Sequence, residues 1–235
     1  FIVFAYTFFY LLWSLFFRIK LFFLRKFSTY EKSEKYIYKT VTDWSRRTIK
    51  LVGAKVDVKG LENIPEEGSC LFVSNHQGIF DFLAIMAYIG RPVGFIAKKE
   101  IKKVPVVSKW MEDMHCIFLN RESLRESLKE INLGIENIKH GNNMLIFPEG
   151  TRSRSSRLGE FKKGSLRMAL KTNVPIVPIT MNGSYKVFEA NGNKVKKENV
   201  SMIVGKPIYT KNLSLEERKD LVNIVRNAVA ENIIK

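Results

Sequence analysis

The sequence predicts an α/β fold, with a largely parallel central sheet flanked by helices and with membrane-associated helices in front of it. Three observations support this. Short apolar runs alternate with helical patterns after residue 51, which is typical of a parallel sheet. The first 17 residues carry no charge. The chain has 235 residues, enough for one α/β domain but too few for two ordinary catalytic domains.

The N-terminal segment is expected to seek a membrane. Residues 1–24 contain 11 of the 28 aromatic residues, and the uncharged stretch 1–17 is at the lower limit of the roughly 17 to 25 apolar residues that span a bilayer. Residues 18–50 then carry ten Lys or Arg against three acids, which predicts that the rest of the chain stays on the cytoplasmic side. Whether residues 1–24 span the bilayer or enter one leaflet stays open.

Two other readings of this segment are weaker. A cleaved signal peptide would need a basic segment before the apolar run and a small-residue cleavage site after it, and neither is present. A buried core helix fits poorly with a segment that is apolar and aromatic on all sides. We therefore expect an N-terminal anchor or an interfacial helix.

A second helix is expected over residues 31–51. Ile37, Val41 and Trp44 recur at helical spacing among charged residues, so this helix is amphipathic and can lie along a membrane surface. We divide the chain into an anchor with an amphipathic helix, residues 1–51, and an α/β domain, residues 52–235.

The α/β domain is predicted from alternating segments. The expected strands are 54–60, 69–75, 93–98, 116–120, 144–148, 174–180 and 200–205. The expected helices are near 81–89, 102–114, 123–140 and 164–172. Ser214 and Glu217 form a capping box that begins a last helix reaching about Lys235.

The amino-acid composition limits the classes of function that this protein can have. There are 39 Lys and Arg against 23 Asp and Glu, a net charge of +16, so an anionic partner is expected. Nucleic acid, anionic lipid and phosphorylated small molecules all fit this charge. Cys70 and Cys116 both lie in apolar runs, which argues against a disulfide scaffold and a thiolate metal site and favours the reducing cytosol.

The first chemical motif is His76 with Asp81, directly after the strand 69–75. In a regular helix this offset turns the second side chain about 140° away from the first, so the two can meet only if His76 lies in the strand-to-helix turn. Gly78 favours such a turn, and Asp81 then lies in the first helical turn. A carboxylate that accepts one imidazole N–H leaves the other nitrogen free as a general base.

The second motif is residues 147–153, which end a strand and begin a basic run. Between Arg152 and Lys171, Glu160 is the only acid. Arg121 also follows a strand. Ligands of α/β sheets bind at the carboxyl ends of strands, and Arg suits bidentate phosphate recognition, so these residues predict a phosphate site beside the histidine.

The sequence gives less support for other kinds of functional site. His115 and His140 have no acidic neighbour at a useful spacing, and we expect ordinary structural or surface roles for them. The chain has no Gly-x-Ser-x-Gly elbow, no Walker A motif and no dinucleotide-binding glycine pattern.

Four blocks follow one another in the chain: NHQGIFD (75–81), CIFLNR (116–121), FPEGTRS (147–153) and VPIVPI (174–179). In this order they resemble the PlsC-type 1-acyl-sn-glycerol-3-phosphate (lysophosphatidic acid) acyltransferases of the glycerolipid acyltransferase family. The resemblance spans about residues 52–210. The second block departs from the family, which often has Gly at the position of His115 and Asp at that of Asn120.

The resemblance implies a single acyltransferase-like domain and a role for each matching residue. His76 corresponds to the general base and Asp81 to the residue that orients it. Glycerol phosphate binding is implied for Arg121, Glu149, Gly150, Thr151 and Arg152, and less specifically for Lys98 and its neighbour Lys99. In this family the acceptor hydroxyl attacks an acyl thioester directly, so no metal and no cofactor is expected.

The implied function is transfer of a fatty acyl group from acyl-CoA or acyl carrier protein to the sn-2 hydroxyl of lysophosphatidic acid, which forms phosphatidic acid. The expected partners are these donors, the acceptor lipid and an anionic bilayer, and the expected location is the cytoplasmic side of the cytoplasmic membrane. An acyltransferase for glycerol 3-phosphate or another lysophospholipid remains an alternative. A basic membrane-binding or nucleic-acid-binding protein without turnover is a remote one.

Overall fold

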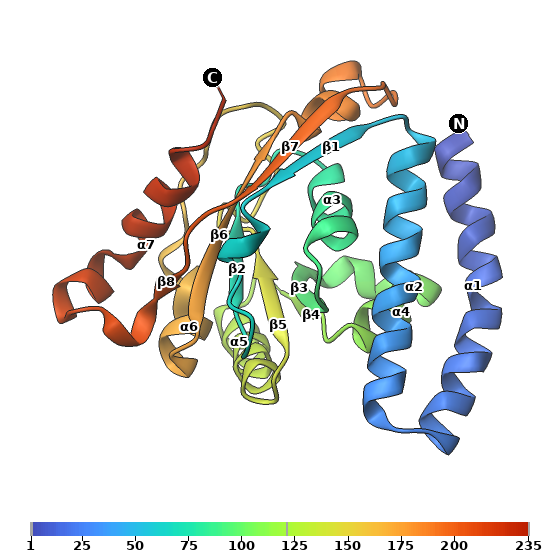
Figure 1. Ribbon diagram of the computed structural model, residues 1–235, viewed down its shortest axis with the longest axis horizontal. Helices are drawn as coiled ribbons and strands as arrows, with labels where there is room; N and C mark the ends of the chain where they lie inside the picture. Colours follow the sequence, from blue (N-terminus) through green and yellow to red (C-terminus); the bar gives the residue numbers. More distant parts are fainter. Residues whose placement is uncertain (1, 121, 235) are drawn as a thin grey trace.

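The structure is a computed structural model, and it describes residues 2–120 and 122–234 (Figure 1). Its helices are α1 (Ile2–Phe27), α2 (Tyr30–Leu51), α3 (Phe80–Tyr88), α4 (Pro105–Asp113), α5 (Leu124–Lys139), α6 (Arg167–Thr172) and α7 (Leu215–Ala230). Its strands are β1 (Lys55–Lys59), β2 (Leu71–Ser74), β3 (Val93–Lys98), β4 (Ile117–Leu119), β5 (Asn143–Ile146), β6 (Pro175–Asn182), β7 (Asn199–Val204) and β8 (Ile208–Tyr209).

The strands form one sheet in the order β1-β7-β6-β2-β5-β3-β4, with β8 paired to β6. Strands β6, β2, β5, β3 and β4 run parallel to one another. Strand β7 runs antiparallel to β6, and β1 runs parallel to β7. The prediction of a largely parallel sheet is confirmed. The carboxyl ends of five neighbouring strands therefore meet at one edge, where ligands of α/β sheets bind.

Two hydrophobic cores cover the two faces of the sheet, and β2 contributes to both. Cys70 and Phe72 pack with α2 and α3, whereas Leu71 and Val73 pack with α5, α6 and α7. Every residue of β2 is fully buried, as expected for a central strand that is covered on both faces. The turn that follows β2 is therefore fixed from both sides.

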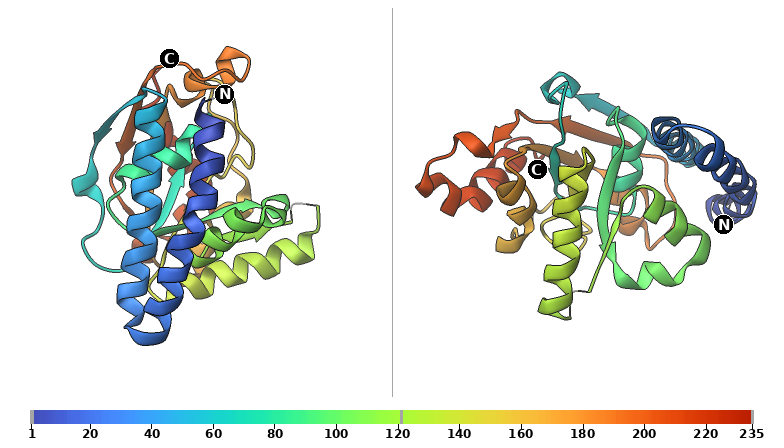
Figure 2. Two further views of the ribbon diagram at one scale, coloured as in Figure 1. Left: turned by 90° about the vertical axis from the view of Figure 1, so that its right-hand side faces the viewer. Right: turned by 90° about the horizontal axis from the view of Figure 1, so that it is seen from below.

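The N-terminal helices α1 and α2 lie side by side as an antiparallel pair at the edge of the molecule opposite α7 (Figures 1 and 2). Helix α2 packs on α3, and its residue Ile49 belongs to the same core as Phe72. The hydrophobic core thus continues across residue 51, where the sequence suggested a domain boundary.

Helix α1 has one packed side. Its buried Leu21 contacts Ile37 of α2 and Trp110 of α4. Asp113 of α4 forms ion pairs with Arg18 at 2.6 Å and with Arg25 at 2.8 Å. Helix α1 is thus fixed against α2 and α4, and two of the first cations that follow the apolar run pair with a buried acid.

The other side of α1 is an exposed apolar face. Its members are Phe8, Phe9, Leu12, Trp13, Leu15, Phe16, Ile19, Phe22, Phe23 and Phe27. Within the described residues, Ala5–Phe27 is the one helical segment long and apolar enough to cross a membrane. A contiguous apolar surface of this kind is typical of contact with lipid or with another protein.

The ends of three helices differ from the sequence predictions for reasons that the structure shows. The helix expected near 102–114 is a 3₁₀ turn over Lys99–Lys103 followed by α4, because Pro105 has no N–H to donate and takes the first helical position. The helix expected near 164–172 likewise begins with a 3₁₀ turn at Lys163–Leu166. Helix α7 ends at Ala230, because the following backbone pairs with the side chain of Asn182 instead.

Candidate active site

The candidate site begins where the chain leaves β2. The Asn75 side chain forms two hydrogen bonds with the backbone of Met181 in β6: its amide donates over 2.9 Å and its oxygen accepts over 2.7 Å. Through these two bonds the Asn75 side chain extends the pairing of β2 with β6 by one residue. The position of the next residue is thereby fixed. That residue is His76, as the turn interpretation requires.

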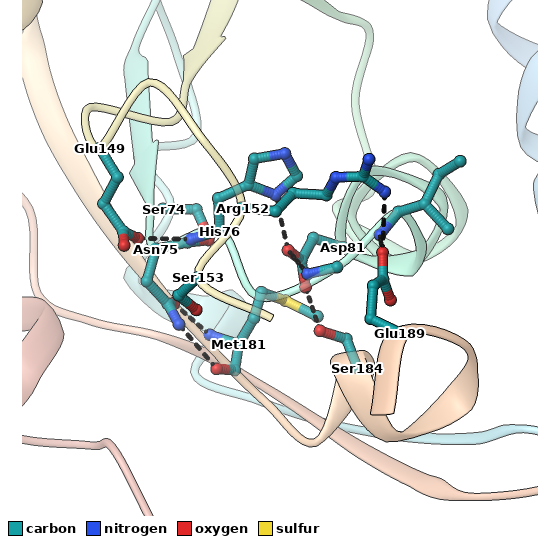
Figure 3. Close-up of polar contacts among 12 residues, drawn as sticks. Ser74, Asn75, His76, Asp81, Glu149, Arg152, Ser153, Met181, Ser184 and Glu189 are labelled. Atoms are coloured by element: carbon teal, nitrogen blue, oxygen red, sulfur yellow. Dashed lines mark hydrogen bonds and ion pairs between the residues drawn. The ribbon is translucent and has the colours of Figure 1, made fainter. Parts of the chain in front are cut away.

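His76 and Asp81 are in direct contact (Figure 3). Nδ1 of His76 lies 2.8 Å from Oδ2 of Asp81. Asp81 lies in the first turn of α3, where its charge is favoured, and its Oδ2 also accepts the backbone N–H of Gly78 over 2.8 Å. The predicted strand–turn–helix arrangement is confirmed. With Asp81 as acceptor, Nδ1 carries the proton and Nε2 has its lone pair available.

The imidazole is held on its face as well. The His76 ring stacks on Phe147, with centroids 4.1 Å apart and an angle of 20° between the planes. The side chain remains 20% exposed, and Nε2 makes no hydrogen bond to any described residue. One nitrogen is thus anchored, while the other is open to a ligand.

Asp81 is fully buried and saturated with donors. Its Oδ1 accepts the hydroxyl of Ser184, which lies in a 3₁₀ turn after β6 and is itself fully buried. A buried carboxylate is costly unless its oxygens accept hydrogen bonds, and here the imidazole, a backbone N–H and a hydroxyl supply them. The carboxylate is therefore fixed in place beside His76.

Glu149 joins the third sequence block, 147–153, to the first, 75–81. Its carboxylate accepts the backbone N–H of His76 over 2.7 Å and that of Gly159 over 2.9 Å. Burial raises the pKa of Glu149 above its ordinary value, and the two N–H donors act in the opposite direction. Both oxygens thus accept backbone N–H groups, which gives Glu149 a structural role at this edge of the sheet.

The loop after β5 is also fixed to the histidine turn through its backbone. Ser153 donates its N–H to the carbonyl of His76 over 2.8 Å, and Arg154 donates to that of Gln77 over 3.1 Å. Block 147–153 therefore lies against block 75–81, as the sequence suggested for two strand ends at one edge of the sheet.

Arg152 points across this loop to a residue that the sequence did not single out. Its Nη1 lies 2.8 Å from Oε1 of Glu189, and the Arg152 side chain is 36% exposed (Figure 3). The same Glu189 oxygen accepts the backbone N–H of Ile79 over 2.8 Å. The predicted phosphate ligand is therefore beside the histidine turn and already paired with a carboxylate.

The other predicted binding residues lie in different surroundings. Gly150 has a φ of +72°, a backbone conformation that favours glycine, and Thr151 next to it is exposed. Lys98 is exposed at the carboxyl end of β3, and the intervening strand β5 separates β3 from β2. Arg121 lies outside the described residues. The structure thus brings Lys98 to the correct edge of the sheet without placing it against His76.

Ser184 and Glu189 both contact the His76–Asp81 turn, but the sequence analysis did not single them out. Ser184 is 103 residues from Asp81, and Glu189 is 110 residues from Ile79, so no local spacing points to these contacts. His115 has no acidic neighbour at a useful spacing in the sequence, but it has one in space. Its Nε2 lies 2.9 Å from Oε2 of Glu34 in α2, so His115 links α2 to the segment before β4.

Known proteins are similar to this chain over the segment that contains the site. A model of the acyltransferase family matches residues 55–182, which contain the His76–Asp81 turn and the 147–153 loop. The chain is similar to the 1-acyl-sn-glycerol-3-phosphate acyltransferase BAT2, chloroplastic, of Brassica napus, with 36% identity over 76% of this chain and 51% of that protein. The chain thus spans about half the length of this curated relative.

Bacterial relatives match over more of their length. The 1-acyl-sn-glycerol-3-phosphate acyltransferase of Borreliella burgdorferi is 32% identical over 78% of this chain and 73% of that protein. The crystal structure of the 1-acyl-sn-glycerophosphate (LPA) acyltransferase PlsC from Thermotoga maritima aligns with a TM-score of 0.83 and 27% identity, covering 99% of this chain and 95% of that chain. The fold, the two blocks at the sheet edge and these matches lead to one conclusion: the chain belongs to the acyltransferase family, among the PlsC-type 1-acyl-sn-glycerol-3-phosphate acyltransferases.

Proposed function

We propose that this protein transfers a fatty acyl group from an acyl thioester to the sn-2 hydroxyl of 1-acyl-sn-glycerol 3-phosphate and so forms phosphatidic acid. The observation that carries the proposal is the 2.8 Å contact between His76 Nδ1 and Asp81, which leaves Nε2 free at the carboxyl edge of the sheet. The relatives named for this reaction support the choice of acceptor.

In this scheme His76 acts as the general base. Nε2 takes the proton of the acceptor hydroxyl while the oxygen attacks the thioester carbonyl carbon. Asp81 stabilises the imidazolium that forms and keeps the ring in the correct tautomer. When the tetrahedral intermediate collapses, the C–S bond breaks and the imidazolium returns its proton to the leaving thiolate. The products are an ester and a free thiol, and the scheme uses neither a metal nor a cofactor.

The acceptor phosphate is proposed to bind at the 147–153 loop. Arg152 is the strongest candidate ligand, because its guanidinium is partly exposed and its backbone adjoins the Ser153–His76 hydrogen bond. Arg121 and Lys98 are further candidates, since Lys98 is the last residue of β3 and Arg121 follows β4 in the sequence. Arginines beside the base would hold the phosphate while the hydroxyl reaches Nε2.

The membrane is proposed as the place of reaction. The exposed apolar face of α1 supports contact with lipid, and the net charge of +16 supports attraction to an anionic surface at about 1 kcal/mol per Lys or Arg near it. The α/β part of the chain would then lie on the cytoplasmic side, where acyl-CoA and acyl carrier protein are available. Both donors carry negative charge and suit a basic protein.

The experiment is to supply purified protein in lipid vesicles with isotope-labelled lysophosphatidic acid and with a fatty acyl thioester of either coenzyme A or acyl carrier protein. Phosphatidic acid with the donor's acyl chain is the expected product by mass spectrometry. Glycerol 3-phosphate and a lysophospholipid that bears a larger headgroup are offered in parallel. Acylation of either one in preference to lysophosphatidic acid would change the acceptor, and no transfer to any of them would refute the proposal.

A further inference from the structure

Glu189 occupies a position that a simple structural role does not explain. Its side chain is only 2% exposed, and its Oε2 is buried without a hydrogen-bond partner among the described residues. Capping the N–H of Ile79 requires only a neutral acceptor, such as a hydroxyl or an amide. Burying a carboxylate there carries a desolvation cost that a neutral residue would avoid.

The ion pair with Arg152 offsets this cost. Oε1 of Glu189 receives both Nη1 of Arg152 and the N–H of Ile79, each over 2.8 Å. Ile79 precedes α3 and lies within the turn that joins His76 to Asp81. One carboxylate oxygen therefore connects the guanidinium directly to the backbone of that turn.

The packing around Glu189 is tight on the side of the turn. A Cβ atom on Gly78 would lie 2.5 Å from Oε2 of Glu189 and 3.2 Å from Cα of Tyr185. The carboxylate therefore has little room to move toward the turn, and the guanidinium that it holds is fixed with respect to His76.

The pairing also leaves part of Arg152 available. A guanidinium has five N–H donors, and one nitrogen, Nη1, is engaged with Glu189. The Arg152 side chain is 36% exposed, so its other donors can reach an anion at the site. A guanidinium oriented in advance loses less conformational entropy when it binds a phosphate.

From these contacts we infer that Glu189 is a positioning residue for the acyl acceptor. It holds the Arg152 guanidinium beside the His76–Asp81 turn in the orientation that receives the phosphate monoester of the acceptor. This inference rests on the proposed function and deepens it, since it names a residue outside the four sequence blocks that governs acceptor binding through Arg152.

The test is a double-mutant cycle on steady-state kinetics with lysophosphatidic acid as the varied substrate. Glu189→Ala alone should raise KM for lysophosphatidic acid about 10-fold or more with a smaller change in kcat, as expected when a charged hydrogen bond that orients a ligand group is lost. Glu189→Gln keeps an acceptor for Ile79 but removes the charge, and should give an intermediate KM. In an Arg152→Ala background, Glu189→Ala should raise KM by less than about twofold, because the group that it orients is gone.

Glu198 provides a matched control. It is paired with Lys196 at 3.0 Å and lies after the 3₁₀ turn Glu189–Asn191, directly before β7. Glu198→Ala should leave both kinetic constants unchanged. Thermal unfolding of each variant checks folding, and Glu189→Gln keeps the test usable if Glu189→Ala does not fold. Inhibition by glycerol 3-phosphate adds a second readout, because its inhibition constant should rise in parallel with KM.

The possible results separate this inference from the proposed function. If Glu189→Ala raises KM equally with and without Arg152, or lowers kcat alone, the positioning role is refuted while the enzyme assignment stands. If the wild-type protein forms no phosphatidic acid, the proposed function fails first. A rise in KM that depends on Arg152 supports the inference.

Discussion

Oε1 of Glu149 accepts the backbone N–H of His76 over 2.7 Å, so a residue of the third sequence block holds the His76–Asp81 turn of the first. The other oxygen holds Gly159, and burial raises the pKa of this carboxyl. Glu149 therefore connects three segments of the chain at the edge of the sheet. Its ionisation should affect both stability and activity.

The Glu149 carboxyl should give a measurable pH dependence of stability. Its pKa in the folded protein is above the ordinary 4.5, so its contribution to the free energy of unfolding is fully present below about pH 4.5 and is lost as the pH rises through the folded pKa. Glu149→Gln has no titrating group there. The unfolding free energy of the wild type minus that of Glu149→Gln should therefore decrease as the pH rises from about 4.5 through the folded pKa. Urea unfolding in detergent at several pH values measures this difference.

The exposed Glu62 gives the control for this titration. Glu62→Gln should follow the wild type at every pH. Glu149→Gln should also lose activity, because one amide cannot accept the N–H groups of both His76 and Gly159. An unfolding difference that rises with pH would contradict the assigned direction of the pKa.

Ser184 should matter for turnover although it does not reach the substrate side of the imidazole. Ser184→Ala removes the hydroxyl that donates to Oδ1 of Asp81, and the buried carboxylate is left with an unfilled acceptor position. We expect kcat to fall about 10-fold, the equivalent of about 1.4 kcal/mol, with KM for lysophosphatidic acid nearly unchanged.

Ser108 serves as the matched control, because it is also buried but its hydroxyl bonds only to Pro105 in its own helix, α4. Ser108→Ala should keep the wild-type kcat. Equal kcat values for Ser184→Ala and wild type would show that Asp81 does not need this hydrogen bond.

Gly78 should tolerate no side chain. A Cβ atom there would lie 2.5 Å from Oε2 of Glu189, so the turn or Glu189 must shift. We expect Gly78→Ala to lower kcat/KM at least about 10-fold and the unfolding free energy by about 1–3 kcal/mol, as overpacking does elsewhere. Gly164→Ala, where a Cβ meets nothing within 4 Å, is the comparison and should be close to neutral. Wild-type kinetics for Gly78→Ala would mean that the site adapts to the added methyl group.

Asp113 should hold the N-terminal helix in place. Asp113→Asn weakens the ion pairs with Arg18 and Arg25, which are partly exposed, so we expect a loss of about 1–2 kcal/mol rather than the larger cost of a fully buried pair. Trypsin should then cut after Arg25 or Lys26 faster than in the wild type. Asp43→Asn, which affects only the exposed pair with Lys39, should leave the cleavage rate unchanged. Equal cleavage rates for Asp113→Asn and wild type would refute the docking role.

Contacts between residues close in the sequence could be predicted, whereas contacts between distant segments could not. His76 and Asp81 are five residues apart, so the strand, turn and helix between them determine their geometry. Ser184 and Glu189 meet the same turn only after the chain has passed through β6. A single sequence gives no signal for such a contact, because hydroxyls and carboxylates in loops are common. The ion pair of Arg152 with Glu189 could not be predicted for the same reason.

The N-terminal region shows a similar limit. The two helices followed from apolar content and helical spacing, but the position of Arg18 and Arg25 against Asp113 depends on the packing of α1 on α4. Cations after an apolar run were expected to face the cytoplasm. Two of them pair with an acid that lies almost a hundred residues further along the chain.

The most direct measurement is the rate of phosphatidic acid formation by purified His76→Ala beside the wild type, under identical vesicle and donor conditions. Because Nε2 would have to accept the hydroxyl proton, the variant should be slower by about 10² to 10⁴ while its unfolding midpoint stays close to that of the wild type. Acyl transfer by a folded His76→Ala protein at the wild-type rate would contradict the mechanism.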